Sequence, residues 1–358
     1  MKLETQVTET KNPQQRGREI GDRWAPQIRH TCALYLDFFS QVDIDPRQVR
    51  AIAESSLDAL QGWCPELAEE LTATAEGAGL PVWQLAALNA RTEILAALAE
   101  ATLGECSTAV YAPDTTDEAP RTLQTWDWHD ALVPHGLLLQ LTAATGLTVK
   151  LFTEFGMLGK IGVNSAGLGL HFNILHHRSD NASGGVPVHA VARRVLEEAR
   201  NVDEAIELAR SARVSASTVL TVFSRHNQRP RAASIEMSPQ ATALVLPGTD
   251  GWITHTNHFL APELVTGDRT VDDTTHNRLA HVDAQRDAMR VGDLAQRARA
   301  FCGAEGEQAP ICFHPDLHLA PQERWETLLT VAIDSERGDL LYRTGTPMAL
   351  AENGYLRF

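Results

Sequence analysis

The sequence predicts an α+β fold in which mainly antiparallel sheets are covered by helices on their outer faces. Residues 17–103 carry apolar side chains at helical spacing, whereas residues 106–175 show the shorter period of strands. The remainder returns to two helices, strands, a helical region and final strands. This order suits a layered α+β architecture. Because no internal repeat or low-complexity linker occurs, we expect one structural unit.

Helices in the first part of the chain are predicted from the spacing of apolar residues and from the prolines at the helix starts. Trp24, Ile28 and Cys32 lie four residues apart and predict a first helix. Each of the next three helices is expected to begin at a proline, because proline is favourable in the first turn of a helix. These starts are Pro46, Pro65 and Pro81.

The later elements follow from apolar runs between turn residues. Strands are expected at 109–111, 122–126, 137–141, 148–152, 160–170 (as strand, turn, strand), 219–223, 232–236, 243–246, 328–333 and 340–343. Helices are expected from 188 to 199, from 202 through 208, and over 273–301.

The charge balance excludes some classes of partner. The chain has 31 basic and 46 acidic residues, a net charge of −15. Nucleic acids and anionic lipid surfaces both need basic protein surface, so neither is expected as a partner. No apolar run is long enough to span a membrane. The polar start, residues 1–5, lacks the apolar stretch of a signal peptide, and we expect a cytoplasmic protein.

The cysteines and histidines give no sign of a disulfide framework or a metal site. The five cysteines are odd in number, irregularly spaced, and include no CxxC pair. His255 and His258 form an HxxH pattern, but it lacks the glutamate of a zinc-protease helix. We therefore expect no metal and no cofactor.

Cys106 is the strongest candidate for a functional residue. It lies where the helical pattern gives way to strands, among small polar neighbours. If the bond between Glu105 and Cys106 were cut, Cys106 would carry both a thiol nucleophile and a free α-amino group. An α-amino group has a pKa of about 7.7–8.0, so it can accept the proton of the thiol at neutral pH. This is the logic of a hydrolase with an N-terminal nucleophile.

Five segments, in order along the chain, resemble one family. They are 104–108 (GECST), 125–128 (TWDW), 159–167 (GKIGVNSAG), 255–259 (HTNHF) and 311–315 (ICFHP). The chain resembles the acyl-coenzyme A:6-aminopenicillanic acid acyltransferase family, also called isopenicillin N acyltransferase-like peptidases. The resemblance implies a four-layer αββα N-terminal-nucleophile hydrolase fold. It also implies self-cleavage before Cys106, into a mostly helical α chain (1–105) and a β chain (106–358) that stay associated.

The resemblance implies roles for further residues. Asp127 would orient the new α-amino group, and Asn257 would stabilise the oxyanion with a neutral amide donor. Possible supporting residues complete the site. They are Ser107 and Thr108 beside the nucleophile, Ser217 and Ser238 in segments that the family uses near its site, His258, and Phe313.

Two positions depart from the family pattern. Glu105 stands before the scissile bond, where the fungal acyltransferase has glycine, which accepts a strained backbone more easily. Phe313 stands where many relatives carry arginine, and this change indicates a less anionic or more aromatic ligand.

The expected activity is hydrolysis of an N-acyl or aminoacyl amide through a thioester. Transfer of the acyl group to an amine, or from a coenzyme A thioester, is the first alternative. A conventional cysteine hydrolase with His258 as base, and a catalytically silent binding protein, are the others. The sequence leaves the substrate open.

Overall fold

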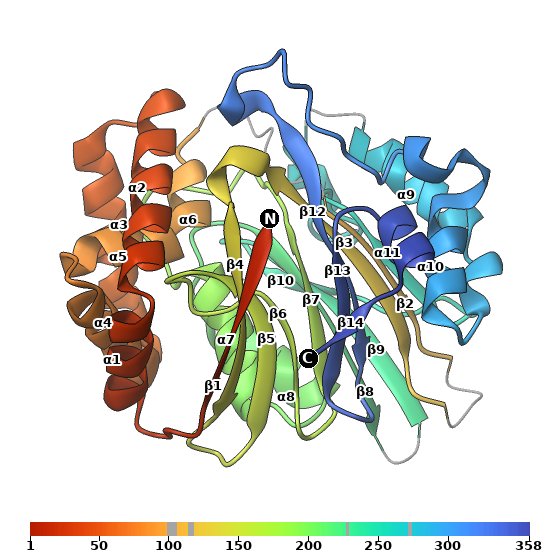
Figure 1. The fold of residues 1–358 in the computed structure, drawn as a ribbon, viewed down its shortest axis with the longest axis horizontal. Coiled ribbons are helices and arrows are strands. Elements are labelled where there is room, and N and C mark those ends of the chain that lie inside the picture. The colour runs from red at the N-terminus through yellow and green to blue at the C-terminus, as the bar shows by residue number, and fades with distance from the viewer. Residues whose placement is uncertain (99–105, 114–117, 227–228, 271–273) are drawn as a thin grey trace.

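The computed structural model describes residues 1–98, 106–113, 118–226, 229–270 and 274–358. Helices form one outer layer, two sheets form the middle, and further helices cover the second sheet (Figure 1). The predicted αββα order of four layers is confirmed. Glu105 and the bond expected to be cut lie outside the described residues.

The first outer layer is built from the N-terminal helices and from two helices of the middle of the chain. Their bounds are α1 (Pro13–Arg23), α2 (Ala25–Gln41), α3 (Pro46–Trp63), α4 (Pro65–Ala78), α5 (Val82–Asn89), α6 (Arg91–Leu95), α7 (Val188–Glu198) and α8 (Val202–Ser211). The expected starts at Pro46 and Pro65 are confirmed. Pro81 is the N-cap of α5, so that helix begins one residue later.

The larger sheet has the strand order β1-β4-β5-β6-β7-β8-β9-β10 within the described residues. Its strands are β1 (Lys2–Thr8), β4 (His135–Thr142), β5 (Thr148–Glu154), β6 (Ile161–Asn164), β7 (Gly169–Ile174), β8 (Thr218–His226), β9 (Arg229–Met237) and β10 (Thr242–Val245). Strand β1 pairs in parallel with β4, and the other neighbours are antiparallel.

The smaller sheet has the order β11-β2-β3-β12-β13-β14 and is antiparallel throughout. Its strands are β2 (Ser107–Tyr111), β3 (Arg121–His129), β11 (Trp252–His255), β12 (Trp325–Asp334), β13 (Asp339–Thr344) and β14 (Leu356–Arg357). Helices α9 (Thr274–Ala284), α10 (Leu294–Cys302) and α11 (Pro347–Asn353) lie outside it (Figure 1).

The sequence did not predict strand β1 or the break in the region expected to be helical over 273–301. Strand β1 inverts the usual alternation of buried apolar and exposed polar side chains, because Gln6 and Thr8 are buried while Val7 is 54% exposed. The side-chain oxygen of Gln6 accepts a hydrogen bond from the indole nitrogen of Trp24. The helical region expected over 273–301 is interrupted. Asp293 caps α10 by accepting a hydrogen bond from Gln296 N, so a new helix starts there.

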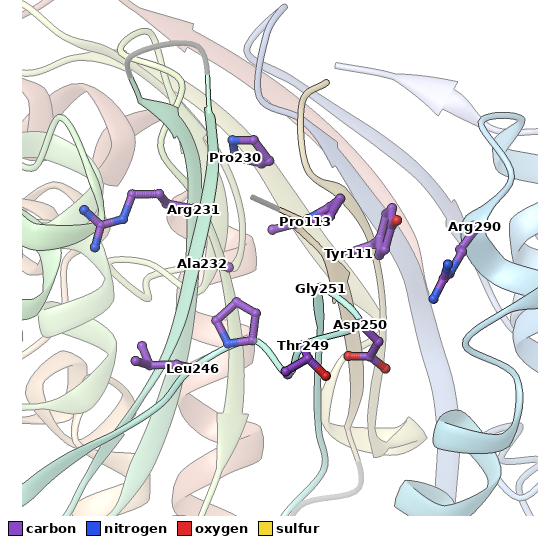
Figure 2. Close-up of a pocket in the computed structure, with 13 residues that line it drawn as sticks. Tyr111, Pro113, Pro230, Arg231, Ala232, Leu246, Thr249, Asp250, Gly251 and Arg290 are labelled. Carbon is purple, nitrogen blue, oxygen red and sulfur yellow. The ribbon is translucent and has the colours of Figure 1, made fainter. Parts of the chain in front are cut away.

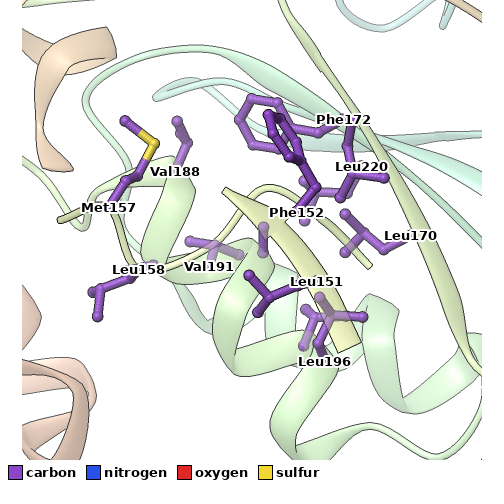
Figure 3. Close-up of a cluster of buried hydrophobic side chains, with 14 of the residues drawn as sticks. Leu151, Phe152, Met157, Leu158, Leu170, Phe172, Val188, Val191, Leu196 and Leu220 are labelled. Carbon is purple, nitrogen blue, oxygen red and sulfur yellow. The ribbon is translucent and has the colours of Figure 1, made fainter. Parts of the chain in front are cut away.

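The core is divided by the layers. One large cluster fills the space between the first helical layer and the two sheets, and Figure 3 shows its part where Val188, Val191 and Leu196 of α7 pack on the larger sheet. A second cluster lies between the smaller sheet and the C-terminal helices, around Leu123, Phe301 and Met289. In the described part of the chain, no helix is long and apolar enough to cross a membrane.

Helices α1 and α4 approach closely at glycines. A Cβ atom on Gly17 would lie 2.3 Å from Glu70 O, and one on Gly21 would lie 2.4 Å from Thr74 O. Neither backbone oxygen can move without shifting α4. The close approach therefore requires glycine at both positions.

We expect Gly17→Ala to lower the free energy of unfolding by about 1–3 kcal/mol, because the added methyl group forces the helices apart. Urea denaturation monitored by circular dichroism measures the change. Gly62→Ala is the matched control, because a methyl group on Gly62 in α3 would point into open space, with no neighbouring side chain within 4 Å. It should gain up to about 1 kcal/mol from helix propensity. Equal effects of the two substitutions would contradict this account of the contact.

Candidate active site

Cys106 lies immediately before β2, the strand between β3 and β11 in the smaller sheet. Its side chain is buried, at 4% exposure. Its carbonyl oxygen accepts hydrogen bonds from Asn173 Nδ2 at 3.1 Å and from Arg278 Nη1 at 2.8 Å. Asn173 belongs to β7 of the other sheet and Arg278 to α9, so three layers hold the main chain of Cys106.

Strand pairing brings Asp127 to this point. Ser107 pairs with Thr125 in the register of β2 and β3, so Asp127 lies near the start of β2. Asp127 is fully buried, and Thr125 Oγ1 donates to its Oδ2 at 2.9 Å. Ser107 N in turn donates to Thr125 Oγ1 at 3.2 Å. A chain of hydrogen bonds thus links the carboxylate of Asp127 to the residue after the nucleophile.

The register of β2 and β11 brings Asn257 to the opposite side. His255 pairs with Thr108, and continuing the antiparallel register by two residues places Asn257 opposite Cys106. Asn257 Nδ2 donates to Ile174 O at 2.9 Å, and Asn257 Oδ1 accepts from Arg278 Nη2 at 3.1 Å. The structure therefore brings together the three residues that the sequence predicted, Cys106, Asp127 and Asn257.

The environment makes the Cys106 thiol hard to ionise. Burial raises its pKa to about 12, and the negative charge of Asp127 acts in the same direction. A hydrogen bond from the Asp127 backbone and the positive charges of Lys160 and Arg278 lower the pKa, but do not outweigh burial. The thiol therefore needs a base close by before it can act as a nucleophile.

Three of the predicted supporting residues lie in this region. Ser107 Oγ accepts from Arg278 Nη1 at 3.2 Å, and Thr108 Oγ1 donates to Asn173 Oδ1 at 2.8 Å. The ring of Phe313 lies under the guanidinium of Arg278, with Cζ 5.9 Å from the ring centroid. Phe313 N donates to Thr327 Oγ1, which anchors the segment to β12 beside Asp127.

Two other predicted residues differ in position, because Ser217 makes its contact elsewhere, whereas His258 shares the Thr275 hydroxyl with the backbone of Asn257. Ser217 Oγ donates to Asp180 Oδ1 at 2.5 Å, beyond the end of β7. His258 Nδ1 lies 2.9 Å from Thr275 Oγ1, and its ring centroid lies 4.1 Å from that of His276. Burial and the neighbouring His276 lower the pKa of His258 to about 4.

Ser238 bonds with Ala241 in the turn between β9 and β10, as a local hydroxyl contact. Its oxygen both donates to Ala241 O and accepts from Ala241 N.

The sequence analysis missed a buried charged cluster beneath the site. Glu154 Oε1 accepts from Arg91 Nη1 at 2.6 Å and from Lys160 Nζ at 2.7 Å, and all three side chains are at most 2% exposed. Lys160 Nζ also lies 3.8 Å from the ring centroid of Trp126, next to Asp127 in β3. Burial and the charge of Arg91 lower the pKa of Lys160 to about 7. A glutamate ending an apolar strand was the signal that could have indicated this cluster.

A cavity of about 660 Å³ lies at the other end of β2 from Cys106. Tyr111, Asp250 and Arg290 line it (Figure 2). None of the predicted site residues contributes to this cavity. No group of three or more His, Cys, Asp or Glu side chains suited to a metal ion occurs among the residues that the structure describes.

Comparisons with known proteins identify the family of the chain. A family model described as acyl-coenzyme A:6-aminopenicillanic acid acyl-transferase matches residues 115–347. The chain belongs to this family of acyltransferases. It is 35% identical over 202 residues to the 40 kDa form of acyl-coenzyme A:6-aminopenicillanic-acid-acyltransferase from Emericella nidulans. That match covers 56% of this chain and 53% of the fungal protein, so the chain spans about half the length of this curated relative.

Two solved structures are also similar at low sequence identity. Penicillin V acylase from Agrobacterium tumefaciens is 13% identical, with a TM-score of 0.40 over 67% of this chain and 83% of that chain. The N-acylethanolamine-hydrolyzing acid amidase orthologue of Caenorhabditis elegans is 12% identical, with a TM-score of 0.42 over 64% of this chain and 93% of that chain.

We expect Glu154→Gln to lower the free energy of unfolding by about 3–5 kcal/mol, because it leaves two buried cations without their carboxylate. Burial raises the pKa of Glu154, but Arg91 and Lys160 outweigh it and hold the pKa below its usual value. The stabilisation by Glu154 is therefore present above its unfolded pKa of about 4.3 and is lost as pH falls through the folded pKa.

Urea denaturation at several pH values measures this difference. Glu54→Gln is the control, because Glu54 forms an exposed pair with Arg50 that contributes at most about 1 kcal/mol. A Glu154→Gln protein as stable as this control at pH 7 would show that the cluster does not depend on its carboxylate.

Proposed function

We propose that the chain is a precursor that cuts itself before Cys106 and then acts as a cysteine amidohydrolase with an N-terminal nucleophile. The substrate class is an N-acyl or aminoacyl amide, and the reaction passes through a thioester on Cys106. The observation that carries the proposal is the register of β2, which places Asp127 on one side of Cys106 and Asn257 on the other.

Self-cleavage follows from the chemistry of a thiol beside its own peptide bond. The Cys106 sulfur attacks the carbonyl carbon of the preceding residue, and the carbon–nitrogen bond breaks to give a thioester and a free amine. Water then hydrolyses the thioester, which releases the carboxylate of residues 1–105 and restores the thiol. The product is a β chain that begins with an α-amino group at Cys106.

The new amine supplies the base that the buried thiol lacks. Its pKa of about 7.7–8.0 suits proton transfer from the thiol at neutral pH. Asp127, whose charge and backbone act on Cys106, would hold the protonated amine, and Asn257 would supply a neutral donor for the oxyanion. Attack on the substrate amide gives a second thioester and releases the amine product after it takes up the proton. Water completes the hydrolysis.

Acyl transfer is the second candidate, supported by the membership of the family and by the name of the fungal relative. Transfer differs from hydrolysis in one reactant. Either an amine attacks the thioester in place of water, or a coenzyme A thioester supplies the acyl group in place of an amide. Supplying an alkylamine together with an amide substrate to the mature protein distinguishes the two, because an acyltransferase yields the new amide and a hydrolase yields the free acid.

We expect freshly purified protein to show two fragments, residues 1–105 and 106–358, by intact-protein mass spectrometry. Cys106→Ala should give one full-length chain, because it removes the attacking sulfur. Cys32→Ala is the matched control, since Cys32 is also a buried cysteine but lies in α2. Its chain should be cut like the wild type.

A wild type that stays full-length would overturn self-cleavage. Thiol labelling then separates the remaining hypotheses. A reactive Cys106 whose activity is lost in His258→Ala would establish a conventional cysteine–histidine hydrolase, and an unreactive Cys106 would establish a silent binding protein.

A further inference from the structure

Arg278 connects the two parts of the proposed machinery. Its side chain extends from α9 and is fully buried. Nη1 donates to Cys106 O at 2.8 Å, and Nη2 donates to Asn257 Oδ1 at 3.1 Å. One rigid guanidinium thus contacts both the nucleophile residue and the oxyanion residue. A planar group with donors in a fixed fork couples the positions of the two acceptors.

The contact also decides which way the Asn257 amide faces. Arginine has only donors, so it requires the oxygen of the amide, Oδ1, on its own side. Ile174 O accepts only, and it requires Nδ2 on the other side, at 2.9 Å. A flipped amide would place oxygen where an oxyanion needs a donor. Because Nδ2 carries two hydrogens, one can remain on Ile174 O while the other serves the oxyanion.

The charge of the guanidinium acts on the thiol as well. The positive charge of Arg278 lowers the pKa of the Cys106 thiol, in opposition to burial. Asp127 raises the same pKa, and Lys160 lowers it from the side of the larger sheet. Loss of Arg278 would leave Lys160 and Arg91 as the cations that counter burial and Asp127.

We propose that Arg278 is the positioning residue of this site, which fixes the main chain of Cys106 and the amide orientation of Asn257 in one geometry. The assignment rests on the proposed function. It goes beyond the predicted residues, because Arg278 acts through Cys106 and Asn257, whose oxygens it holds.

The test compares Arg278→Gln and Arg278→Lys with Arg286→Gln. Arg286 lies just after the same helix and bonds to Thr254 and Asp283 at the surface, so it controls for the loss of a nearby arginine. The first measurement is the rate of precursor cleavage during cell-free synthesis, followed by intact-protein mass. The second is the pH dependence of Cys106 alkylation by iodoacetamide in the mature protein, with peptide mapping to separate Cys106 from other cysteines.

Arg278→Gln should slow cleavage by about 10- to 100-fold, less than the loss of a whole oxyanion donor. It should also move the alkylation midpoint to higher pH, because a positive charge near the thiol has been removed. Arg278→Lys should keep the midpoint close to that of the wild type. It should still slow cleavage, because one ammonium group cannot hold two separated oxygens in a fixed fork. Arg286→Gln should match the wild type in both measurements.

A purely structural role gives a different pattern. If Arg278→Gln lowers the melting temperature but keeps the wild-type cleavage rate and alkylation midpoint, the assignment is overturned. If the glutamine variant does not fold, the lysine variant decides, and wild-type cleavage in it overturns the assignment. A wild type that neither cleaves nor reacts at Cys106 overturns the proposed function and this inference together. A wild type that cleaves, with Arg278 variants that match it, overturns this inference alone.

Discussion

The position of β2 within the smaller sheet is the constraint on which the site depends. This strand pairs with β3 on one side and β11 on the other, so its two registers place residues from distant parts of the chain around Cys106, which directly precedes it. A shift of either register by one residue would turn the facing side chains to the opposite side of the sheet. Sheet pairing therefore fixes the geometry of the site, and a flexible loop could not hold it as closely.

Polar and charged side chains hold the layers together around this strand. Asn173 reaches across from the larger sheet to Cys106 O, and Arg278 reaches it from α9. Beneath them, Glu154 neutralises part of the charge of Arg91 and Lys160. Buried charges are costly unless they are paired, so the layers of the sandwich must keep these groups in contact. The same contacts that satisfy these groups also set the electrostatic potential at the thiol.

Much of the site could be predicted from the sequence because its signals are local. Cys106 stands at a change of period, and Asp127 and Asn257 lie in short segments typical of a family. Ser217, His258 and Arg278 show the limit of such signals. A hydroxyl, an imidazole and a guanidinium can each form many kinds of contact. Their partners here are Asp180, Thr275 and Cys106, which are all separated from them in the sequence.

By itself, the sequence determined most of the order of helices and strands and the starts of several helices, and it singled out Cys106, Asp127 and Asn257 as candidates. Periodicity and capping act over a few residues, so these features can be read without knowing what packs against them. Only the tertiary structure decided that β1 joins the sheet through buried Gln6 and Thr8, and that Arg278 lies between Cys106 and Asn257. Such contacts depend on strand register and layer packing, which arise from the whole chain.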